Sequence, residues 1–311
     1  MDFKYSYNNK RYHTLDYYYK QKYGCKIAKI SLNGNFTCPN RDGTKGVGGC
    51  IFCSNLGSGD YAGNKQKTIR EQFYEIKEIM DKKWKDTKYI AYFQANTNTY
   101  ACVNILKSKY EEALSLPNVV GINIATRCDA ISDECLDYLE ELNKKTNLII
   151  ELGLQTIHEK TSKLINRGHT LKEFTDMVEK LKEKNINIVV HIINGLPYET
   201  KEDMLETVKF VNSLNIHGIK IHMLHILKNT ELASRYQEEK FHILTKEEYI
   251  DITINQLEHL NDNIVIHRIT GDPKLEDLIK PTWLLKKFCV LNDIDKEMFK
   301  RNSFQGKRVQ N

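Results

Sequence analysis

Two kinds of apolar pattern alternate along most of this chain, and their alternation limits the folds it can adopt. Short β-prone runs are followed by longer segments such as 68–84, where apolar residues have the spacing of an amphipathic helix. The predicted strands lie at 26–32, 89–94, 119–126, 148–155, 187–193 and 218–226. Strands that alternate with helices of this length predict βαβ units and a parallel sheet, so the fold class is α/β.

The chain contains no linker rich in glycine, serine and proline and no low-complexity run, so we expect one main domain with additions at both ends. The 311 residues are enough for one large α/β domain. We predict a tyrosine-rich N-terminal arm over 1–24 that packs across one end of the sheet. The main domain is expected over 25–230, followed by a C-terminal extension over 231–311 that includes a strand near 264–270.

Three cysteines lie in a glycine-rich loop, at about 33–66, that follows the first predicted strand. Cys38 and Cys50 have 11 residues between them, and Cys50 and Cys53 have two. The last two can bind one metal centre locally, and the glycines let Cys38 fold back onto it. Three thiolates point to a [4Fe–4S] cluster with one iron open to a small molecule. A structural zinc site would need a fourth ligand, either Cys25 or a distant histidine.

The remaining cysteines bear on the cellular compartment. They are scattered along the sequence at Cys25, Cys102, Cys128, Cys135 and Cys289. We recognise neither a signal peptide nor an apolar run of membrane-spanning length. We therefore expect a cytoplasmic protein without a membrane partner, in which a disulfide framework is disfavoured. The net charge of +5 is compatible with a polyanionic partner, although many enzymes carry as much.

The cysteine loop resembles the cluster-binding segment of radical S-adenosylmethionine (SAM) enzymes, in a variant with wide spacing. The stretches 36–43, 48–53 and 54–60 are particularly similar to the small YtqA/YhcC-type group, and further matches extend to Gly306. This group is related to the elongator catalytic subunit and to the oxygen-independent coproporphyrinogen oxidases. The resemblance implies a partial (β/α)6 barrel of the TIM type, with a short N-terminal arm and a C-terminal α/β extension.

The resemblance also implies the cofactors and the reaction. Cys38, Cys50 and Cys53 would hold a [4Fe–4S] cluster whose open iron chelates SAM. Reductive cleavage of SAM would give a 5′-deoxyadenosyl radical that takes a hydrogen atom from the substrate. A donor such as flavodoxin or ferredoxin would supply the electron.

Residues at the predicted strand ends match positions where relatives contact SAM, and a parallel barrel collects its active site there. Phe52 resembles the aromatic residue near the adenine, although it could equally fill the loop core. Gln94, Asn96 and Asn98 stand where relatives meet the SAM amino group, but the familiar Gly-Gly-Glu form is missing.

Three further residues are assigned to SAM by the same resemblance. Gln155 is similar to the glutamine that contacts the ribose. Arg167 looks like the arginine that contacts the SAM carboxylate in porphyrinogen-oxidase relatives, with a surface arginine as the alternative. His191 occupies the position of an acidic residue in those relatives, which leaves that ribose contact open.

We predict three catalytic candidates on the substrate side. Glu151 shares a strand face with the cofactor candidate four residues later, and a carboxylate inside a barrel is costly unless it is paired or bound to a ligand. His222 and His225 should face opposite sides of one strand, and we choose His222. Arg268 could hold a substrate carboxylate or phosphate, as could Arg127, and a structural salt bridge is the alternative for both.

We expect tRNA as the substrate, since one MnmL-like branch of the group is thought to trim a carboxymethylaminomethyl group of a wobble uridine to aminomethyl. A basic tail with interleaved aromatic residues fits contact with phosphates and stacking on bases, and equally fits a solvated amphipathic helix. Two alternatives stay open. One is a radical SAM enzyme that acts on a small molecule such as a tetrapyrrole precursor, and the other is a zinc-dependent RNA-binding protein without catalysis.

Overall fold

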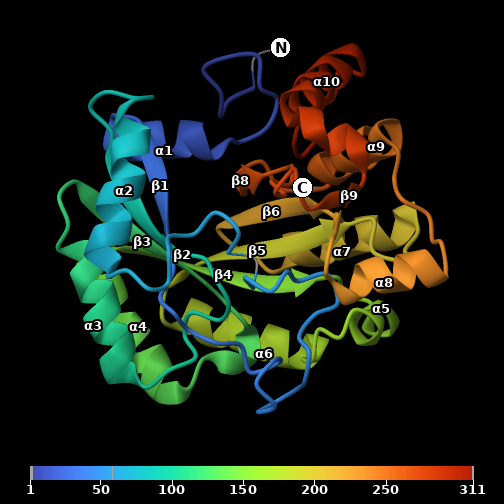
Figure 1. The fold of residues 1–311 in the computed structure, drawn as a ribbon. Helices are drawn as coiled ribbons and strands as arrows, with labels where there is room; N and C mark the ends of the chain where they lie inside the picture. The colour runs from blue at the N-terminus through green and yellow to red at the C-terminus, as the bar shows by residue number, and fades with distance from the viewer. Residues whose placement is uncertain (1–2, 58, 310–311) are drawn as a thin grey trace.

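A curved, open sheet of parallel strands forms the centre of the molecule (Figure 1). The computed structural model describes residues 3–57 and 59–309, and within them the sheet has seven strands in the order β1-β2-β3-β4-β5-β6-β8. Their bounds are β1 Ile27–Leu32, β2 Lys88–Phe93, β3 Val119–Thr126, β4 Asn147–Gln155, β5 Asn187–Asn194, β6 Gly218–Met223 and β8 Val265–Arg268. The predicted partial barrel of parallel strands is thereby confirmed.

The structure adds a seventh strand to the sheet. We placed 264–270 in the C-terminal extension, which we expected to complete the substrate side. In the structure β8 pairs in parallel with β6, with Gly218 opposite Val265, and so adds a strand to the six expected in the barrel. The C-terminal part of the chain therefore helps to build the barrel wall.

Helices cover the outer side of the sheet, where α2, α3, α4 and α6 lie side by side in Figure 1. The α-helices are α1 Leu15–Tyr23, α2 Ile69–Asp81, α3 Val103–Leu114, α4 Asp133–Lys145, α5 Glu159–Leu164, α6 Leu171–Glu183, α7 Lys201–Ser213, α8 Glu231–Glu238, α9 Lys246–Glu258 and α10 Lys287–Lys300. A threonine whose side chain accepts a backbone N–H, together with an acidic residue three positions later, begins α2, α6, α7 and α9. These capping boxes satisfy backbone donors that a helix start otherwise leaves unpaired.

The two faces of the sheet differ in polarity. On the outer face, side chains such as Ile30, Leu32 and Phe93 are fully buried against the helices and form the main hydrophobic core. The inner face carries polar and charged side chains, which alternate with the apolar ones along each strand because successive residues point to opposite faces. The inner face is therefore where the site is expected.

The N-terminal arm closes the amino ends of the strands, as the sequence predicted. Tyr19 on α1 is buried against Ile27 and Ile90, which begin β1 and lie near the start of β2. Thr14 forms a β-bridge with Ile266 of β8, so the arm spans the gap between the two edge strands. One end of the half-barrel is thus sealed, and a substrate must enter from the carboxyl ends.

The C-terminal extension packs against the cysteine loop. The short strands β7 Ile226–Leu227 and β9 Leu278–Lys280 pair antiparallel, and the 3₁₀ turns η1 Cys128–Ala130 and η2 Thr282–Lys286 complete the elements. The backbone N–H of Leu232, in α8, donates to the Ile51 carbonyl at 2.9 Å. Among the described residues, no helix has the length and apolar character needed to cross a membrane.

Candidate active site

A cavity of about 630 Å³ opens at the carboxyl ends of the strands and extends down the inner face of the sheet. It brings together all the predicted site residues except Asn98 and Arg167. The predicted residues that line it are Cys38, Cys50, Phe52, Cys53, Gln94, Asn96, Glu151, Gln155, His191, His222 and Arg268. Its volume is in the range of ordinary ligand sites.

Backbone hydrogen bonds fold the cysteine loop into a compact turn. The N–H of Gly49 donates to the Asn40 carbonyl at 2.8 Å, and the N–H of Cys53 donates to the Cys50 carbonyl at 3.0 Å. Gly48 and Gly49 both have φ of +81°, in the left-handed region that disfavours residues with a Cβ. The glycines therefore allow the turn that brings Cys38 back toward the other two cysteines.

The stretch that follows α5 supports the cysteine loop from the side. The Asn166 amide donates to the Gly49 carbonyl at 2.8 Å, and the Asn40 amide donates to the Asn166 carbonyl at 2.6 Å. The Asn40 amide nitrogen also lies 3.8 Å from the Cys50 sulfur. These reciprocal contacts fix the position of the loop before any cofactor binds.

The three cysteines of the loop do not form a set as compact as the ligands of one zinc ion. Among the described residues, their sulfur atoms do not all lie within 4.8 Å of one another, so at least one pair is more widely spaced, although Cys50 and Cys53 are close enough to share a hydrogen bond. Thiolates on one tetrahedral zinc would lie roughly 3.8 Å apart, since each Zn–S bond is about 2.3 Å. A cluster binds each cysteine at a separate iron.

Cys25 cannot complete a zinc site with these cysteines. It packs against Tyr19, Ile27 and Ile90 at the amino ends of the strands, whereas the cysteine loop follows the carboxyl end of β1. The zinc alternative that used Cys25 as fourth ligand therefore does not fit this fold.

Arg167 lies outside the cavity lining and acts on the backbone around Gln155. Its Nη1 donates to the carbonyls of Leu154 at 2.7 Å and Thr156 at 2.6 Å, and its Nε and Nη2 donate to the His169 carbonyl. Gln155 between them has φ of +62°, a conformation that L-residues rarely adopt. The structure thus gives Arg167 a scaffold position, in place of the SAM contact that we expected.

The three polar residues after β2 have separate positions. The Asn98 side chain is fully buried and donates to the Ala125 carbonyl at 2.8 Å, so it ties β2 to β3 outside the cavity. The Asn96 amide donates to the Phe36 carbonyl at 3.0 Å, and Gln94 accepts from the Ser31 hydroxyl at 3.3 Å. The last two line the cavity and remain candidates for SAM contact.

A group of charged and polar side chains lies on the inner face of the sheet at the cavity, and we call these residues the barrel floor: Lys29, Tyr92, Glu151, His191, Lys220 and Arg268. All of them except Lys29 line the cavity. The Glu151 carboxylate is fully buried and accepts hydrogen bonds from Lys29 at 3.0 Å and from His191 at 2.9 Å. It also accepts from Lys220, whose ammonium donates to the Tyr92 hydroxyl at 2.9 Å. The carboxylate is therefore paired, as the sequence argument required.

Charge and burial shift the pKa values on the floor. Burial raises the pKa of Glu151, but the ammonium groups of Lys220 and Lys29 outweigh this effect and hold it well below its usual value. Burial lowers the pKa of Lys220 to about 7, although Glu151 opposes the shift. Burial, followed by the charge of Lys220, lowers the pKa of His191 to about 4. At neutral pH His191 is therefore a neutral donor to an ionised Glu151.

The two histidines near the end of β6 both line the cavity, which corrects our choice of one over the other. The prediction assumed a strand through 226, whereas β6 ends at Met223. His225 lies beyond this end, so strand alternation does not set its direction. The ring of His222 lies 5.2 Å from that of His191, and burial lowers its pKa well below the usual value.

The two candidate arginines differ in their partners. Arg127 forms hydrogen bonds at 2.9 Å with both carboxylate oxygens of Asp129 and donates to the Arg167 carbonyl, which is the structural pairing we considered. Arg268 is about one-third exposed to the cavity, and its printed ion pair with Asp272 is 3.5 Å long. Arg268 is thus better placed to meet a ligand.

Sequence reasoning missed Lys29 and Lys220, although a signal was present. Each lies in the middle of a strand between isoleucines or other apolar residues. Strands of a parallel sheet are usually apolar throughout, and a lysine inside one must have a partner or a ligand. A search for cations in the middle of such strands would have found both residues.

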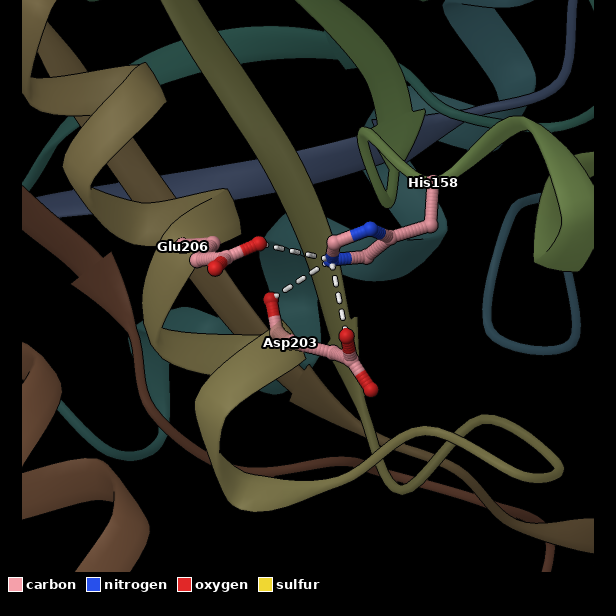
Figure 2. Close-up of side chains that lie close together, drawn as sticks. All are labelled: His158, Asp203 and Glu206. Atoms are coloured by element: carbon pink, nitrogen blue, oxygen red, sulfur yellow. Dashed lines mark hydrogen bonds and ion pairs between the residues drawn. The ribbon is translucent and has the colours of Figure 1, made fainter.

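A separate cluster of His158, Asp203 and Glu206 lies where the loop after β4 meets α7 (Figure 2). The His158 Nε2 atom is 3.0 Å from the main-chain carbonyl oxygen of Asp203, and 3.7 and 3.9 Å from the two carboxylates. A carbonyl only accepts, so Nε2 carries a hydrogen and has no lone pair for a metal. We interpret this cluster as a structural tie.

Parts of the C-terminal tail are engaged with the rest of the molecule. Arg301 pairs with Asp251 at 2.6 Å and with Glu297 at 2.8 Å, and Arg308 pairs with Glu258. The indole of Trp283 donates to the Leu244 carbonyl. Because these arginines are paired with carboxylates, fewer cationic groups of the tail are available to contact RNA phosphates than the sequence suggested.

Comparison with known proteins covers nearly the whole chain. Residues 38–211 match the Radical SAM superfamily, and residues 216–300 match the Radical SAM C-terminal domain. The uncharacterized protein YtqA of Bacillus subtilis is 49% identical over 99% of this chain and 96% of its own length. The protein YhcC of Escherichia coli is 34% identical over 89% of this chain and 88% of its own length.

A solved structure supports the fold. Elp3 from the archaeon Methanocaldococcus infernus superposes with a TM-score of 0.64 over 90% of this chain and 64% of that chain, at 17% identity. The match to the Radical SAM superfamily begins at Cys38, the first cysteine of the loop. In addition, YtqA and YhcC are each more than 30% identical to this chain over most of their length. This chain belongs to the radical SAM superfamily.

Proposed function

We propose that this radical SAM enzyme acts on tRNA and converts the carboxymethylaminomethyl group of a wobble uridine to aminomethyl, with the removed carbons released as glyoxylate. SAM, cleaved to methionine and 5′-deoxyadenosine, would be the two-electron oxidant, and water would supply the aldehyde oxygen. The observation that carries the proposal is one cavity that joins the cysteine loop at its mouth to a charged floor, with room for both a cofactor and the side chain of a nucleoside. A uridine taken out of its base stack could present such a side chain.

The relatives support a substrate of this class. A probable threonylcarbamoyladenosine tRNA methylthiotransferase from Methanocaldococcus jannaschii is 30% identical over 46% of this chain and 34% of its own length. The resemblance to the MnmL-like branch names the same class of substrate. Both arguments support tRNA as the class of substrate. The choice of a uridine side chain is more specific and comes from the MnmL-like resemblance alone.

We assign the cofactor contacts from the lining of the cavity. Cys38, Cys50 and Cys53 would hold the [4Fe–4S] cluster, with Gln94, Asn96, Gln155 and Phe52 placed to surround SAM. Once bound and reduced, the cluster and SAM supply a 5′-deoxyadenosyl radical that removes a hydrogen atom from the substrate. A cytoplasmic flavodoxin or ferredoxin would provide the electron.

The protein's own residues orient the reactants and limit access of water. Arg167 holds the backbone on both sides of Gln155, so that this amide is fixed before SAM arrives. The packing of Ile51 against Leu224 and Leu232 closes the side of the cysteine loop. Such fixed surroundings favour one approach of the substrate to the radical.

Activity on a defined RNA tests the proposal. The reconstituted enzyme, with SAM and dithionite, is incubated with an anticodon stem-loop that carries carboxymethylaminomethyluridine, and the nucleosides are analysed by mass spectrometry. We expect aminomethyluridine and 5′-deoxyadenosine in amounts that rise together. Unchanged nucleosides in this assay, with unchanged tRNA uridines in a deletion strain, would contradict the tRNA substrate but leave the enzyme class intact.

A further inference from the structure

The barrel floor carries more positive than negative charge. When Lys220 is protonated, Lys29, Lys220 and Arg268 contribute three cationic groups, whereas Glu151 and Asp272, the ion-pair partner of Arg268, contribute two carboxylates, which leaves an excess of one. The neighbouring histidines do not add to this charge at neutral pH, because burial lowers the pKa of both. The floor therefore has the charge to balance one anionic group.

The geometry shows which cations are open to a ligand. Glu151 is enclosed. One carboxylate oxygen accepts from Lys29 and from the Asn123 amide, and the other accepts from Lys220 and His191. The side chain of Arg268 is 36% exposed and is held by Asp272 only at 3.5 Å. In the register of the sheet, Lys220 lies directly opposite Arg268. A ligand that reaches this level meets both cations from neighbouring strands.

Burial makes this excess charge costly without a ligand. The side chain of Lys220 is 6% exposed, and its ammonium has two neutralising or polar partners, Glu151 and Tyr92. A buried cation that lacks its own counter-ion destabilises a fold, so it is retained most readily where a ligand completes the charge balance. Ionic clusters with shifted pKa values inside a cleft are typical of functional sites.

We propose that the barrel floor binds a carboxylate at the end of the substrate, with Arg268 and Lys220 as its contacts and Glu151 as the residue that positions the lysines. A carboxylate carries one negative charge, which equals the excess on the floor, whereas a terminal phosphate carries about 1.5 to 2. The inference rests on the proposed function for its identification of this group as the carboxylate of a carboxymethylaminomethyl side chain. Beyond the proposed function, the inference states where the carboxylate binds and which residues select it.

A matched pair of small probes tests the floor without RNA and without turnover. N-methylglycine carries the carboxylate and the secondary amine of the proposed group, and N-methylglycinamide has the same shape without the anionic charge. Binding of each probe to the reconstituted protein is measured by saturation-transfer NMR. We expect the wild-type protein to bind the acid at least about tenfold more tightly than the amide, as for loss of one charged hydrogen-bond partner. Equal binding of the two probes overturns the proposal.

Variants locate the site. Arg268→Met and Lys220→Met remove one cation each, and both should lose the preference for the acid. Lys88→Met makes the same chemical change at the exposed first residue of β2, outside the cavity lining, and should keep the preference. Circular dichroism checks that each variant is folded, and Lys220→Arg, which keeps the charge, should retain the preference. A preference that persists in both methionine variants overturns the proposal.

A binding experiment with RNA distinguishes this inference from the proposed function. Stem-loops with carboxymethylaminomethyluridine and with aminomethyluridine are compared in binding by fluorescence anisotropy, and the first should bind about tenfold more tightly. If neither RNA binds but N-methylglycine still requires Arg268 and Lys220, the tRNA substrate is wrong and the carboxylate site stands. If the RNA is converted but the two stem-loops and the two probes bind equally, the function stands and the carboxylate site is wrong.

Discussion

The mouth and the floor of the same cavity are built in different ways. At the mouth, one continuous loop supplies the three cysteines, and backbone hydrogen bonds and glycines set its shape. On the floor, separate strands supply one or two side chains each, and a buried carboxylate holds the cations in place. The difference predicts that the cysteines at the mouth can be replaced without loss of the fold, whereas replacements on the floor should affect both the stability of the fold and the proposed carboxylate site.

The largest effect is expected from the loop cysteines. Cys38→Ala, Cys50→Ala and Cys53→Ala should each reduce bound iron and 5′-deoxyadenosine formation to background, while the melting temperature of the apoprotein stays close to that of the wild type. The exposed Cys102 and Cys289 provide controls, since their alanine variants should keep the bound iron and the 5′-deoxyadenosine formation of the wild type. Similar losses in all five variants would remove the ligand assignment.

Glu151→Gln should show the opposite behaviour. The variant leaves two buried lysines without their shared counter-ion, and the free energy of unfolding should fall by about 3–5 kcal/mol in chemical denaturation. Iron content per folded chain should not change. Glu183→Gln, at an exposed carboxylate at the end of α6, is the control and should change stability by less than about 0.5 kcal/mol. A stable Glu151→Gln protein would show that the floor does not support the fold.

Arg167→Lys distinguishes a scaffold from a cofactor contact. Lysine keeps the charge but cannot donate to the Leu154, Thr156 and His169 carbonyls together. We expect the free energy of unfolding to fall by about 1–3 kcal/mol. Arg235→Lys, at an exposed ion pair on α8, should have little effect. A large loss of SAM affinity with unchanged stability would restore the carboxylate contact suggested by the sequence.

Carboxylate binding should weaken as the pH rises. Burial lowers the pKa of Lys220 to about 7, so its ammonium is present below pH 7 and is lost above it. The affinity for N-methylglycine should therefore fall several-fold between pH 6 and pH 8, as measured by NMR titration. The other charged or titratable groups near Lys220 are Lys29, Tyr92, Glu151, His191, His222, His267 and Arg268.

The Lys220→Arg variant is the control for this pH dependence. Arginine stays charged throughout the range, so its binding curve should be flat between pH 6 and pH 8. An equal slope in the variant and the wild type would assign the titration to another group on the floor.

The smallest effect is expected from Gln155→Ala. Loss of one neutral hydrogen bond costs about 0.5–1.5 kcal/mol, which corresponds to a rise of about 2- to 10-fold in the Kd for SAM. Equilibrium dialysis of the reconstituted protein measures this change. Gln66→Ala, at an exposed position of the cysteine loop, should leave the Kd unchanged. No change at Gln155 would remove the ribose assignment.

The sequence predicted local features well because they depend on neighbours in the chain. The alternation of apolar patterns predicted the parallel sheet, and the spacing of Cys38, Cys50 and Cys53 in a glycine-rich loop indicated the family. Both signals lie within short stretches of sequence. The position of Glu151 inside the barrel was also predicted, since burial of a carboxylate has a clear physical cost.

Features that depend on pairing between distant residues were not predicted. Lys29, Glu151 and Lys220 belong to β1, β4 and β6, which are not neighbours in the sheet, so they meet only across the inside of the curved sheet. The role of Arg167 depends on the left-handed backbone conformation of Gln155, and no local sequence pattern predicted this conformation. The seventh strand of the barrel arises from pairing of β8 with β6, whereas the sequence pattern placed this strand in the C-terminal extension and predicted no partner for it.

The account depends most on an iron atom at the mouth that has no protein ligand. The direct measurement is the electron paramagnetic resonance spectrum of the dithionite-reduced, reconstituted protein before and after addition of SAM. We predict about four iron atoms per chain and a reduced-cluster signal whose g values change when SAM binds. A colourless protein with zinc, or a cluster signal that SAM does not change, would contradict the account.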